Sequence, residues 1–114
     1  MNSQSKGKRF ERDLAKIINK KLGVNCRRTP NSGALSFKGD LVDINPDSIA
    51  NRFHFEAKNQ ESLNIWNALK QAIRDCPVIK TPLVIFTRNF EDQYVAMRLG
   101  DFLNLLLEIE ENGK

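Results

Sequence analysis

The first hydrophobic pattern along the chain is that of an amphipathic helix over about residues 7–22. Five large apolar residues recur at helical spacing and predict one buried stripe: Phe10, Leu14, Ile17, Ile18 and Leu22. Four basic residues fall on the opposite face: Arg9, Arg12, Lys16 and Lys20. Gly23 predicts the helix end. Glu11 lies at the border of the apolar stripe, so its carboxylate can lean toward the packed surface and still reach water.

Three short strands are predicted next, each bounded by turn-forming residues. The first covers residues 24–28 and precedes a turn-rich segment at 29–33. The second covers 39–44 and is closed by Asn45-Pro46-Asp47. The third covers 52–58 and alternates strictly, with Phe53, Phe55 and Ala57 on one face. His54, Glu56 and Lys58 therefore share the other face.

The second half of the chain predicts a helix, two strands and a terminal helix. The helix is marked by Leu63, Trp66, Leu69, Ile73 and Cys76, and Ser62 could cap it. Trp66 falls on the apolar stripe, which favours a core position over a base-stacking platform. The continuous apolar run 82–87 is typical of a central strand buried on both faces. Residues 94–99 predict a further strand, and 101–110 a helix with Leu103, Leu106 and Leu107 at helical spacing.

This order of elements, αβββαββα, predicts a single α/β domain over residues 1–114. The first three strands are close in sequence and should form a meander. The helix between the third and fourth strands implies a crossover and a parallel neighbour. We therefore expect a mixed sheet with helices packed on it.

The charge is distributed unevenly along the 114 residues. Residues 1–39 contain ten Lys or Arg and two acids, a net charge of +8, and the remainder has a net charge of −4. A concentrated basic surface favours a polyanion such as DNA. Two other interpretations stay open, a solvated basic face without a ligand and an adaptor that binds acidic proteins.

Other compositional features narrow the function classes. Cys26 and Cys76 form no CxxC pair and are expected to be free thiols. The polar start and the absence of an apolar run of about 18 residues favour a cytoplasmic protein over a secreted or membrane protein. The chain has no histidine or cysteine cluster for zinc and no phosphate-cradling glycine loop, so no nucleotide cofactor is expected. Its compactness suits a phage or mobile element as well as a cellular genome.

The triplet Glu56-Ala57-Lys58 is the main chemical feature. Hydrolysis of a phosphodiester needs positive charge at the transition state and an activated water. A divalent metal held by carboxylates supplies both, and a nearby lysine can position or deprotonate the water. Asp40 begins the preceding strand and is placed to converge on Glu56. The backbone carbonyl of Ala57 could be a further metal ligand. Taken alone, the triplet could equally be a surface ion pair.

These residues resemble a known family. Asp40 followed by Glu56-Ala57-Lys58 resembles the motif of the PD-(D/E)xK nucleases. Residues 6–12, Lys-Gly-Lys-Arg-Phe-Glu-Arg, resemble the first helix of the archaeal-type Holliday junction resolvases, and residues 28–33 resemble their Arg-x-Pro-x-Ser stretch. The resemblance covers about residues 6–60. It implies a restriction-endonuclease-like core and a Mg²⁺-dependent endodeoxyribonuclease (Mn²⁺ may substitute), with junction resolution as the first choice.

The resemblance also implies roles. Asp40 and Glu56 would bind the metal, Glu11 would contact it directly or through water, and Lys58 would orient or activate the water. Ser32 would lie near the scissile phosphate and Arg28 would hold the DNA backbone. The other expected DNA-binding residues are Lys6, Lys8, Arg9, Arg12, Arg27 and Gln60. A resolvase cuts two strands symmetrically, so a homodimer is expected, joined through the second helix or exposed parts of the sheet.

Several alternatives accompany this interpretation. Gly39 stands where the motif name has proline. Asp43 is a rival ligand, but it faces the other side of its strand from Asp40. His54 could contact DNA, although a structural role is favoured. The competing functions are a restriction, repair or phage DNA-processing nuclease and a non-catalytic DNA-binding module.

Overall fold

The structure is a computed structural model that describes residues 3–29 and 39–113. The helices are α1 (Ser3–Leu22), α2 (Ile65–Asp75) and α3 (Leu99–Asn112), with a short 3₁₀ helix, η1 (Ile49–Arg52). The strands are β1 (Cys26–Arg28), β2 (Leu41–Asp43), β3 (Phe53–Asn59), β4 (Thr81–Thr87) and β5 (Tyr94–Ala96). This order of main elements is the predicted one.

The five strands form one mixed sheet in the order β1-β2-β3-β4-β5. The pairs β1–β2, β2–β3 and β4–β5 are antiparallel, whereas β3 and β4 are parallel along seven residue pairs. Helix α2 forms the crossover between the two parallel strands. The predicted meander, crossover and mixed α/β sheet are therefore confirmed.

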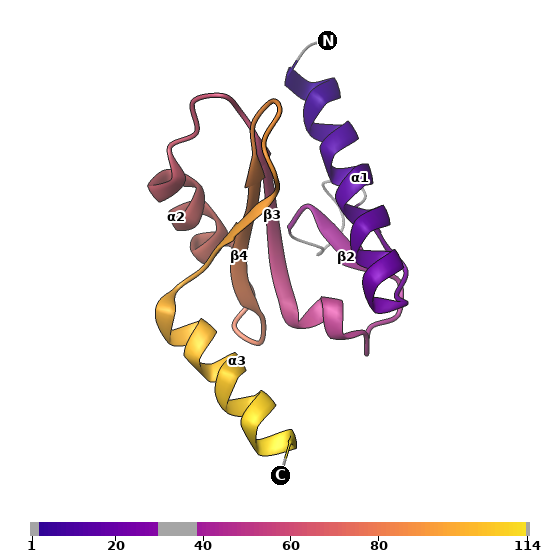
Figure 1. Cartoon of the computed structure of the whole chain (residues 1–114), viewed down its shortest axis with the longest axis vertical. Coiled ribbons are helices and arrows are strands. Elements are labelled where there is room, and N and C mark those ends of the chain that lie inside the picture. The colour runs from indigo at the N-terminus through magenta and orange to yellow at the C-terminus, as the bar shows by residue number, and fades with distance from the viewer. Residues whose placement is uncertain (1–2, 30–38, 114) are drawn as a thin grey trace.

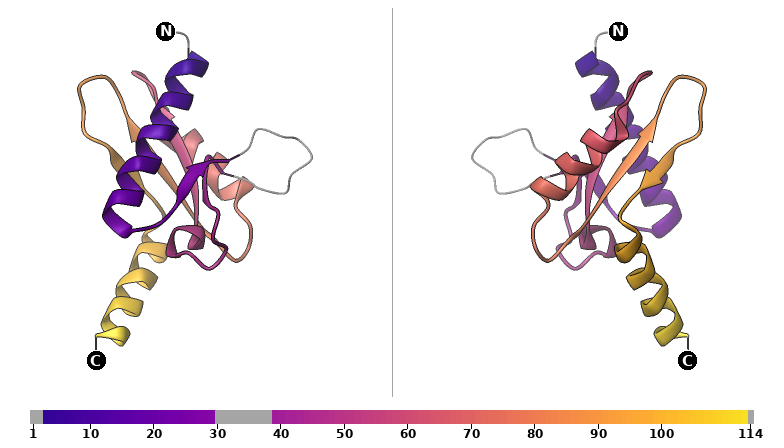
Figure 2. Two further views of the ribbon diagram at one scale, coloured as in Figure 1. Left: turned by 90° about the vertical axis from the view of Figure 1, so that its right-hand side faces the viewer. Right: turned by 90° about the vertical axis from the view of Figure 1, so that its left-hand side faces the viewer.

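The helices α1 and α2 cover opposite faces of the sheet (Figures 1 and 2). The larger core cluster joins Phe10 and Leu14 of α1 to Phe55 of β3 and to Leu83 and Ile85 of β4. The smaller cluster lies under α2 and centres on three buried residues, Ala68, Ala72 and Val84. The alternating pattern of β3 thus sends Phe55 toward α1 and His54 and Glu56 toward the other face, as the sequence predicts.

Local hydrogen bonds explain the element ends. Gly23 adopts a positive φ of 67° and donates its amide to the Asn19 carbonyl, which ends α1 as predicted. The prediction that Ser62 caps the second helix is wrong. Asn64 is the cap, because its side chain accepts a hydrogen bond from the Asn67 amide.

Three predicted apolar stripes are less buried than expected. Ile17 and Leu22 of α1 are about half exposed. The core prediction for Trp66 is wrong, as this residue is 72% exposed. Trp66 lies two positions before Ala68, on the far side of α2 from the sheet. The third stripe belongs to α3, none of whose residues is buried.

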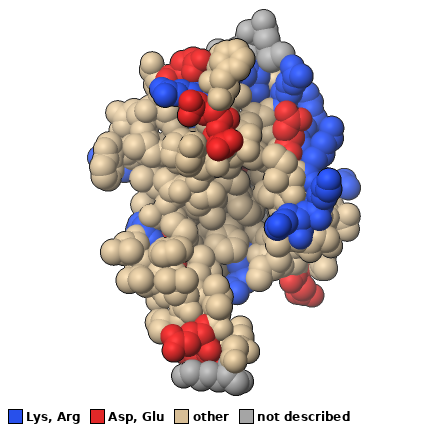
Figure 3. Space-filling model, viewed as in Figure 1, with Lys and Arg blue, Asp and Glu red and all other residues tan. Residues whose placement is uncertain are grey.

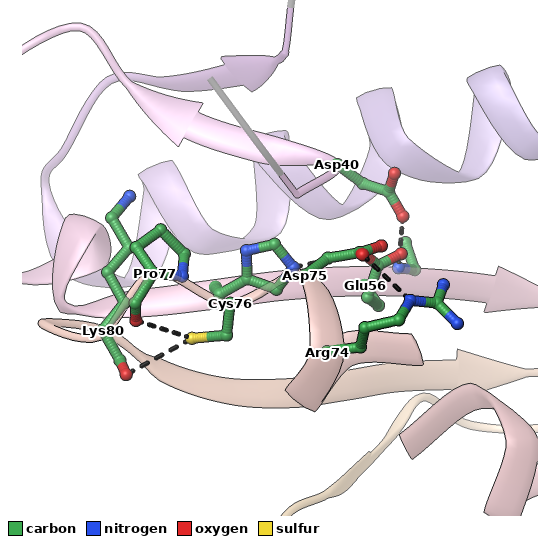
Figure 4. A network of polar contacts seen from close by, with 9 residues as sticks. Asp40, Glu56, Arg74, Asp75, Cys76, Pro77 and Lys80 are labelled. Carbon is green, nitrogen blue, oxygen red and sulfur yellow. Dashed lines mark hydrogen bonds and ion pairs between the residues drawn. The ribbon is translucent and has the colours of Figure 1, made fainter. Parts of the chain in front are cut away.

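The two cysteines are free thiols, as predicted. Burial, and next the charge of Asp43, raise the pKa of the Cys26 thiol. Burial also raises the pKa of Cys76, whose sulfur donates to the carbonyls of Pro77 and Lys80 (Figure 4). Both thiols are therefore kept in the protonated, weakly nucleophilic form. No helix within residues 3–29 and 39–113 has the length and apolar character needed to cross a membrane.

Candidate active site

Asp40 is held against β3 at the point where the chain enters β2. Its amide donates to the Phe55 carbonyl at 2.7 Å, and its Oδ2 accepts a hydrogen bond from the Ala57 amide at 2.6 Å. Gly39 precedes it with a φ of 87°, a conformation that residues with a Cβ rarely adopt. These two hydrogen bonds therefore fix Asp40 beside Glu56 of β3 (Figure 4), and the charge of Lys58 acts on the Asp40 carboxyl.

Glu56 is buried, with 5% of its surface exposed, and it contacts a fully buried histidine. The His54 Nε2 and the Glu56 Oε1 lie 3.2 Å apart. A Cβ on residue 39 would come within 3.2 Å of the His54 Nδ1 and 3.1 Å of the Phe55 carbonyl oxygen. Glycine at position 39 therefore provides space for the imidazole that contacts Glu56. His54 is therefore in contact with the candidate metal ligand Glu56. The alternation of the strand predicts that the two residues share a face, but it does not predict this contact.

The electrostatics of the site are those of crowded carboxylates. Burial is the largest effect on Asp40, followed by the negative charge of Glu56, and together they raise the pKa of Asp40 to about 7. The hydrogen bond from Ala57 and the charge of Lys58 act in the opposite direction, and the charge of Glu11 raises the pKa further. Two acidic groups thus share a poorly hydrated space, with Lys58 close enough to influence Asp40. A bound cation would relieve this repulsion.

Glu11 and Arg28 form an ion pair that links α1 to β1. The Arg28 Nε donates to the Glu11 Oε2 at 3.1 Å, and both side chains are largely buried. Within the described part of the chain, no group of three or more His, Cys, Asp or Glu side chains is arranged to hold a metal ion. The structure therefore brings together Asp40 and Glu56, with Glu11 near enough to affect Asp40 but bonded to Arg28.

The residues present fit a divalent metal by their chemistry. The hydrogen bonds described above use one oxygen of Asp40 and one of Glu56, so the second oxygen of each can face a cation. Mg²⁺ prefers hard oxygen ligands and is commonly held by one or two carboxylates with water completing its shell. The Ala57 carbonyl, between Glu56 and Lys58, is the remaining predicted ligand.

Asp43, the last residue of β2, has a structural role. Asp43 is buried, and its carboxylate accepts from the amides of Asn25 and Asn45. Hydrogen bonds from the Ser48 side chain, Asn45 and Asn25 lower the pKa of Asp43. These bonds use the carboxylate to join β1, β2 and η1.

The remaining predicted residues are distributed between a basic helix face and the strand end. Lys8, Arg9, Arg12 and Arg27 are exposed, and Lys6 is half-buried. Lys and Arg side chains line α1 along one side of the molecule in Figure 3. Gln60 is exposed just after β3, and its amide donates to the Thr87 carbonyl. Ser32 lies outside the described residues.

A comparison with solved structures supports the fold. A Holliday junction resolvase, Hjc, from Archaeoglobus fulgidus matches 80% of this chain and 76% of its own, with a TM-score of 0.51 and 21% sequence identity. At this identity the match shows that the two chains share a fold. A search of curated proteins gave no significant match.

The sequence itself matches a family description over almost its whole length. The model of the family described as "Phage putative PDDEXK endonuclease" matches residues 2–112. The matched range includes Asp40, Glu56 and Lys58 and also the elements beyond residue 60, where the sequence alone offered only an order of helices and strands. The chain therefore belongs to the PD-(D/E)xK endonuclease family found in phages.

Proposed function

We propose that this chain is a divalent-metal-dependent DNA endonuclease that acts on branched DNA, with the four-way junction as its preferred substrate. The observation that carries the proposal is the pair Asp40 and Glu56, whose proximity and burial raise the pKa of Asp40 to about 7 beside Lys58. A site that served only to bind DNA would gain nothing from two crowded acids, because they repel phosphate.

Each residue has a defined task in this proposal. Asp40 and Glu56 hold Mg²⁺, with the Ala57 carbonyl and Glu11 as further candidates, directly or through water. A divalent metal held there would supply positive charge against the phosphorane-like transition state and favour ionisation of the attacking water. The Lys58 Nζ orients the attacking water or accepts its proton. Arg28 and the basic face of α1 bind the phosphate backbone on either side of the scissile bond. Ser32 is assigned a place near that bond.

The substrate assignment has two supports besides the site. The Arg-x-Pro-x-Ser stretch at 28–33 resembles that of junction resolvases, and the solved structure of similar fold is a resolvase by its title. A junction has two symmetric strands to cut, so we also propose that the active form is a homodimer. The proposed compartment is the cytoplasm of the host cell, where phage DNA is replicated and recombined.

The decisive experiment compares three DNA substrates of the same sequence. Purified protein is incubated with linear duplex, single strand or a synthetic four-way junction, in Mg²⁺, Mn²⁺ or EDTA. Paired symmetric nicks on the junction, present with metal and lost in EDTA, are the expected result. Equal cutting of all three substrates would reject junction resolution and favour a general nuclease in phage DNA processing. Binding without cutting in any metal would reject the nuclease proposal and favour a non-catalytic DNA-binding module.

Two variants sharpen that comparison. Lys58→Ala should lower the cleavage rate by at least about 100-fold with little change in the Kd for DNA, because it removes a group that acts on the reacting water. Asp47→Asn serves as a matched control, since Asp47 is exposed in a turn and removing its charge should leave cleavage unchanged. Equal rates for Lys58→Ala and the wild type would refute the assignment of Lys58.

A further inference from the structure

The C-terminal helix α3 presents an apolar surface that the rest of the described chain does not cover. None of its residues is buried. Six large side chains on it are between 45% and 69% exposed: Leu99, Phe102, Leu103, Leu106, Leu107 and Ile109. Every view in Figures 1 and 2 shows this helix extending away from one end of the sheet. An isolated helix of this length is marginally stable in water, so packing against something is needed to hold it.

A hollow lined by apolar residues lies where α3 leaves the sheet. Its volume is about 620 Å³, and its lining comes from β3, β4, β5, the residue after β5 and the first turns of α3. The main contributors are Phe53, Val95, Met97, Leu99, Phe102 and Leu105. Phe53 and Met97 also pack against the main core cluster, so the hollow opens directly onto the core. One chain thus carries both a projecting apolar ridge, Leu103, Leu106 and Leu107, and an apolar hollow next to it.

We propose that this surface is the interface with a second copy of the chain, in which the α3 ridge of each copy packs into the hollow of the other. A ridge and a hollow on the same molecule are the elements of a two-fold, self-complementary interface. This inference rests on the proposed function, which needs two active sites, and it assigns the interface to α3 and β5. The sequence alone predicts an interface on the second helix or on exposed parts of the sheet.

The exposed area is close to what a stable dimer needs. At roughly 150–200 Å² for a large side chain, the six half-exposed residues offer on the order of 500 Å² per chain. Val95 of β5, which lines the hollow, is also more than half exposed and extends the patch. The total of roughly 600 Å² reaches the lower end of the range for specific protein interfaces, about 600–1,000 Å² per partner. It also matches the upper size of apolar patches on ordinary monomers, which are often functional.

The charges of α3 argue against DNA or an anionic membrane as the occupant. Residues 99–112 contain four acids and no Lys or Arg. Asp101 is paired with Arg98 at 2.9 Å, and Glu108 with Arg52 at 2.6 Å. These two acids lie on the opposite side of the helix from Leu103 and Leu106. The two paired acids therefore lie on the side of α3 that contacts Arg52 and Arg98, and Leu103 and Leu106 lie away from them.

The test measures the mass of the full-length protein in solution by analytical ultracentrifugation between about 1 and 100 μM, in EDTA and without DNA. We expect twice the 13.1 kDa chain mass for the wild type. Leu106→Glu should raise the dimer Kd by at least about 100-fold, since it places a charge in the buried ridge. Trp66→Glu is the matched control, because Trp66 is the most exposed large apolar residue of α2. Circular dichroism checks whether both variants keep their helices. Leu103→Ala is a milder change on the same ridge.

A wild-type protein that stays monomeric at 100 μM would overturn the proposal. It would also be overturned if Leu106→Glu and Leu103→Ala dimerise like the wild type, or if Trp66→Glu alone gives monomers, which would move the interface to α2. The mass readout does not depend on cleavage. A dimer without nuclease activity would reject the proposed function and keep this interface, whereas an active monomeric nuclease would reject the interface alone.

Discussion

Replacing Asp40 by asparagine should stabilise the metal-free protein at neutral and alkaline pH while abolishing its activity. The ordinary pKa of the aspartate side chain is 3.8, and burial together with Glu56 raises it to about 7 in the fold. Between these two values the folded state binds one more proton than the unfolded state. The free energy of unfolding therefore falls as the pH rises from about 4 to about 7, and it stays low above pH 7.

The size of the effect follows from the shift. One pKa unit corresponds to about 1.4 kcal/mol, so the rise from 3.8 to about 7 costs the ionised protein at most about 4 kcal/mol. Relaxation and water near a partly exposed carboxyl reduce this, and we expect about 2 kcal/mol at pH 8. Asparagine cannot ionise, yet its side-chain oxygen can still accept the hydrogen bond from the Ala57 amide. Asp40→Asn should therefore be more stable than the wild type at pH 8 and equally stable near pH 4.

Urea unfolding followed by circular dichroism in EDTA at pH 4.5, 6 and 8 measures this difference. Asp47→Asn is the control, because the exposed Asp47 should give no pH-dependent difference. Adding Mg²⁺ at pH 8 should stabilise the wild type more than Asp40→Asn, since the variant keeps only one of the two proposed carboxylate ligands. A variant that is less stable than the wild type at pH 8, or a difference that is the same at all three pH values, would refute the reasoning.

Three further predictions concern the surroundings of the site. Gly39→Ala should lower the free energy of unfolding by about 1–3 kcal/mol, because the residue has a positive φ and its Cβ would lie near 3.1 Å from the Phe55 carbonyl oxygen. An unchanged urea midpoint would contradict this reason. His54→Leu should weaken Mg²⁺ binding in calorimetry and raise the Mg²⁺ concentration needed for half-maximal cleavage, because Glu56 loses its partner. His54→Gln should restore part of the affinity. Equal Mg²⁺ affinities for the wild type and both variants would exclude a positioning role for His54. The double variant Arg9→Ala/Arg12→Ala should weaken DNA binding and reduce the slope of log K against log salt by about 2, as measured by fluorescence anisotropy, and an unchanged slope would remove α1 from the DNA interface.

Much of the fold was predictable because its elements bury simple periodic patterns. The alternation of residues 53–58 placed Glu56 and Lys58 on one face, and the continuous apolar run at 82–87 indicated the central strand. Both are dictated by which side chains leave water. The beginning of α1 at Ser3 was not predictable, since its first turn is polar and carries no apolar periodicity.

The exposure of Trp66 and of α3 could not be read from periodicity. A helical stripe shows which residues share a face, but whether that face meets the sheet depends on the tertiary arrangement and the number of strands. The small alanines 68 and 72 allow α2 to approach the sheet closely, and this turns Trp66 outward. For α3, the sheet ends at β5 and offers no surface that covers the whole apolar face.

The candidate site was predictable only in part for a related reason. Asp40, Glu56 and Lys58 follow a spacing that the motif makes visible. The contact between His54 and Glu56, and the Glu11–Arg28 pair, depend on side-chain conformations and on a turn at Gly39 whose φ the sequence does not specify. A glycine directly before a motif aspartate is the one signal that could have indicated the space needed for a buried imidazole.

The sequential strand order has a consequence for how the chain acquires its structure. Each strand pairs with the one next to it in the chain, so only the parallel β3–β4 pair requires closing a long segment, the one that contains α2. Contacts between neighbours in sequence favour rapid folding, which leaves the β3–α2–β4 unit as the expected rate-limiting step. Asp40, Glu56 and Lys58 all emerge from the ribosome before β4 does. The residues proposed for chemistry would thus be synthesised first and gain their rigid support only when the second half of the chain has folded against them.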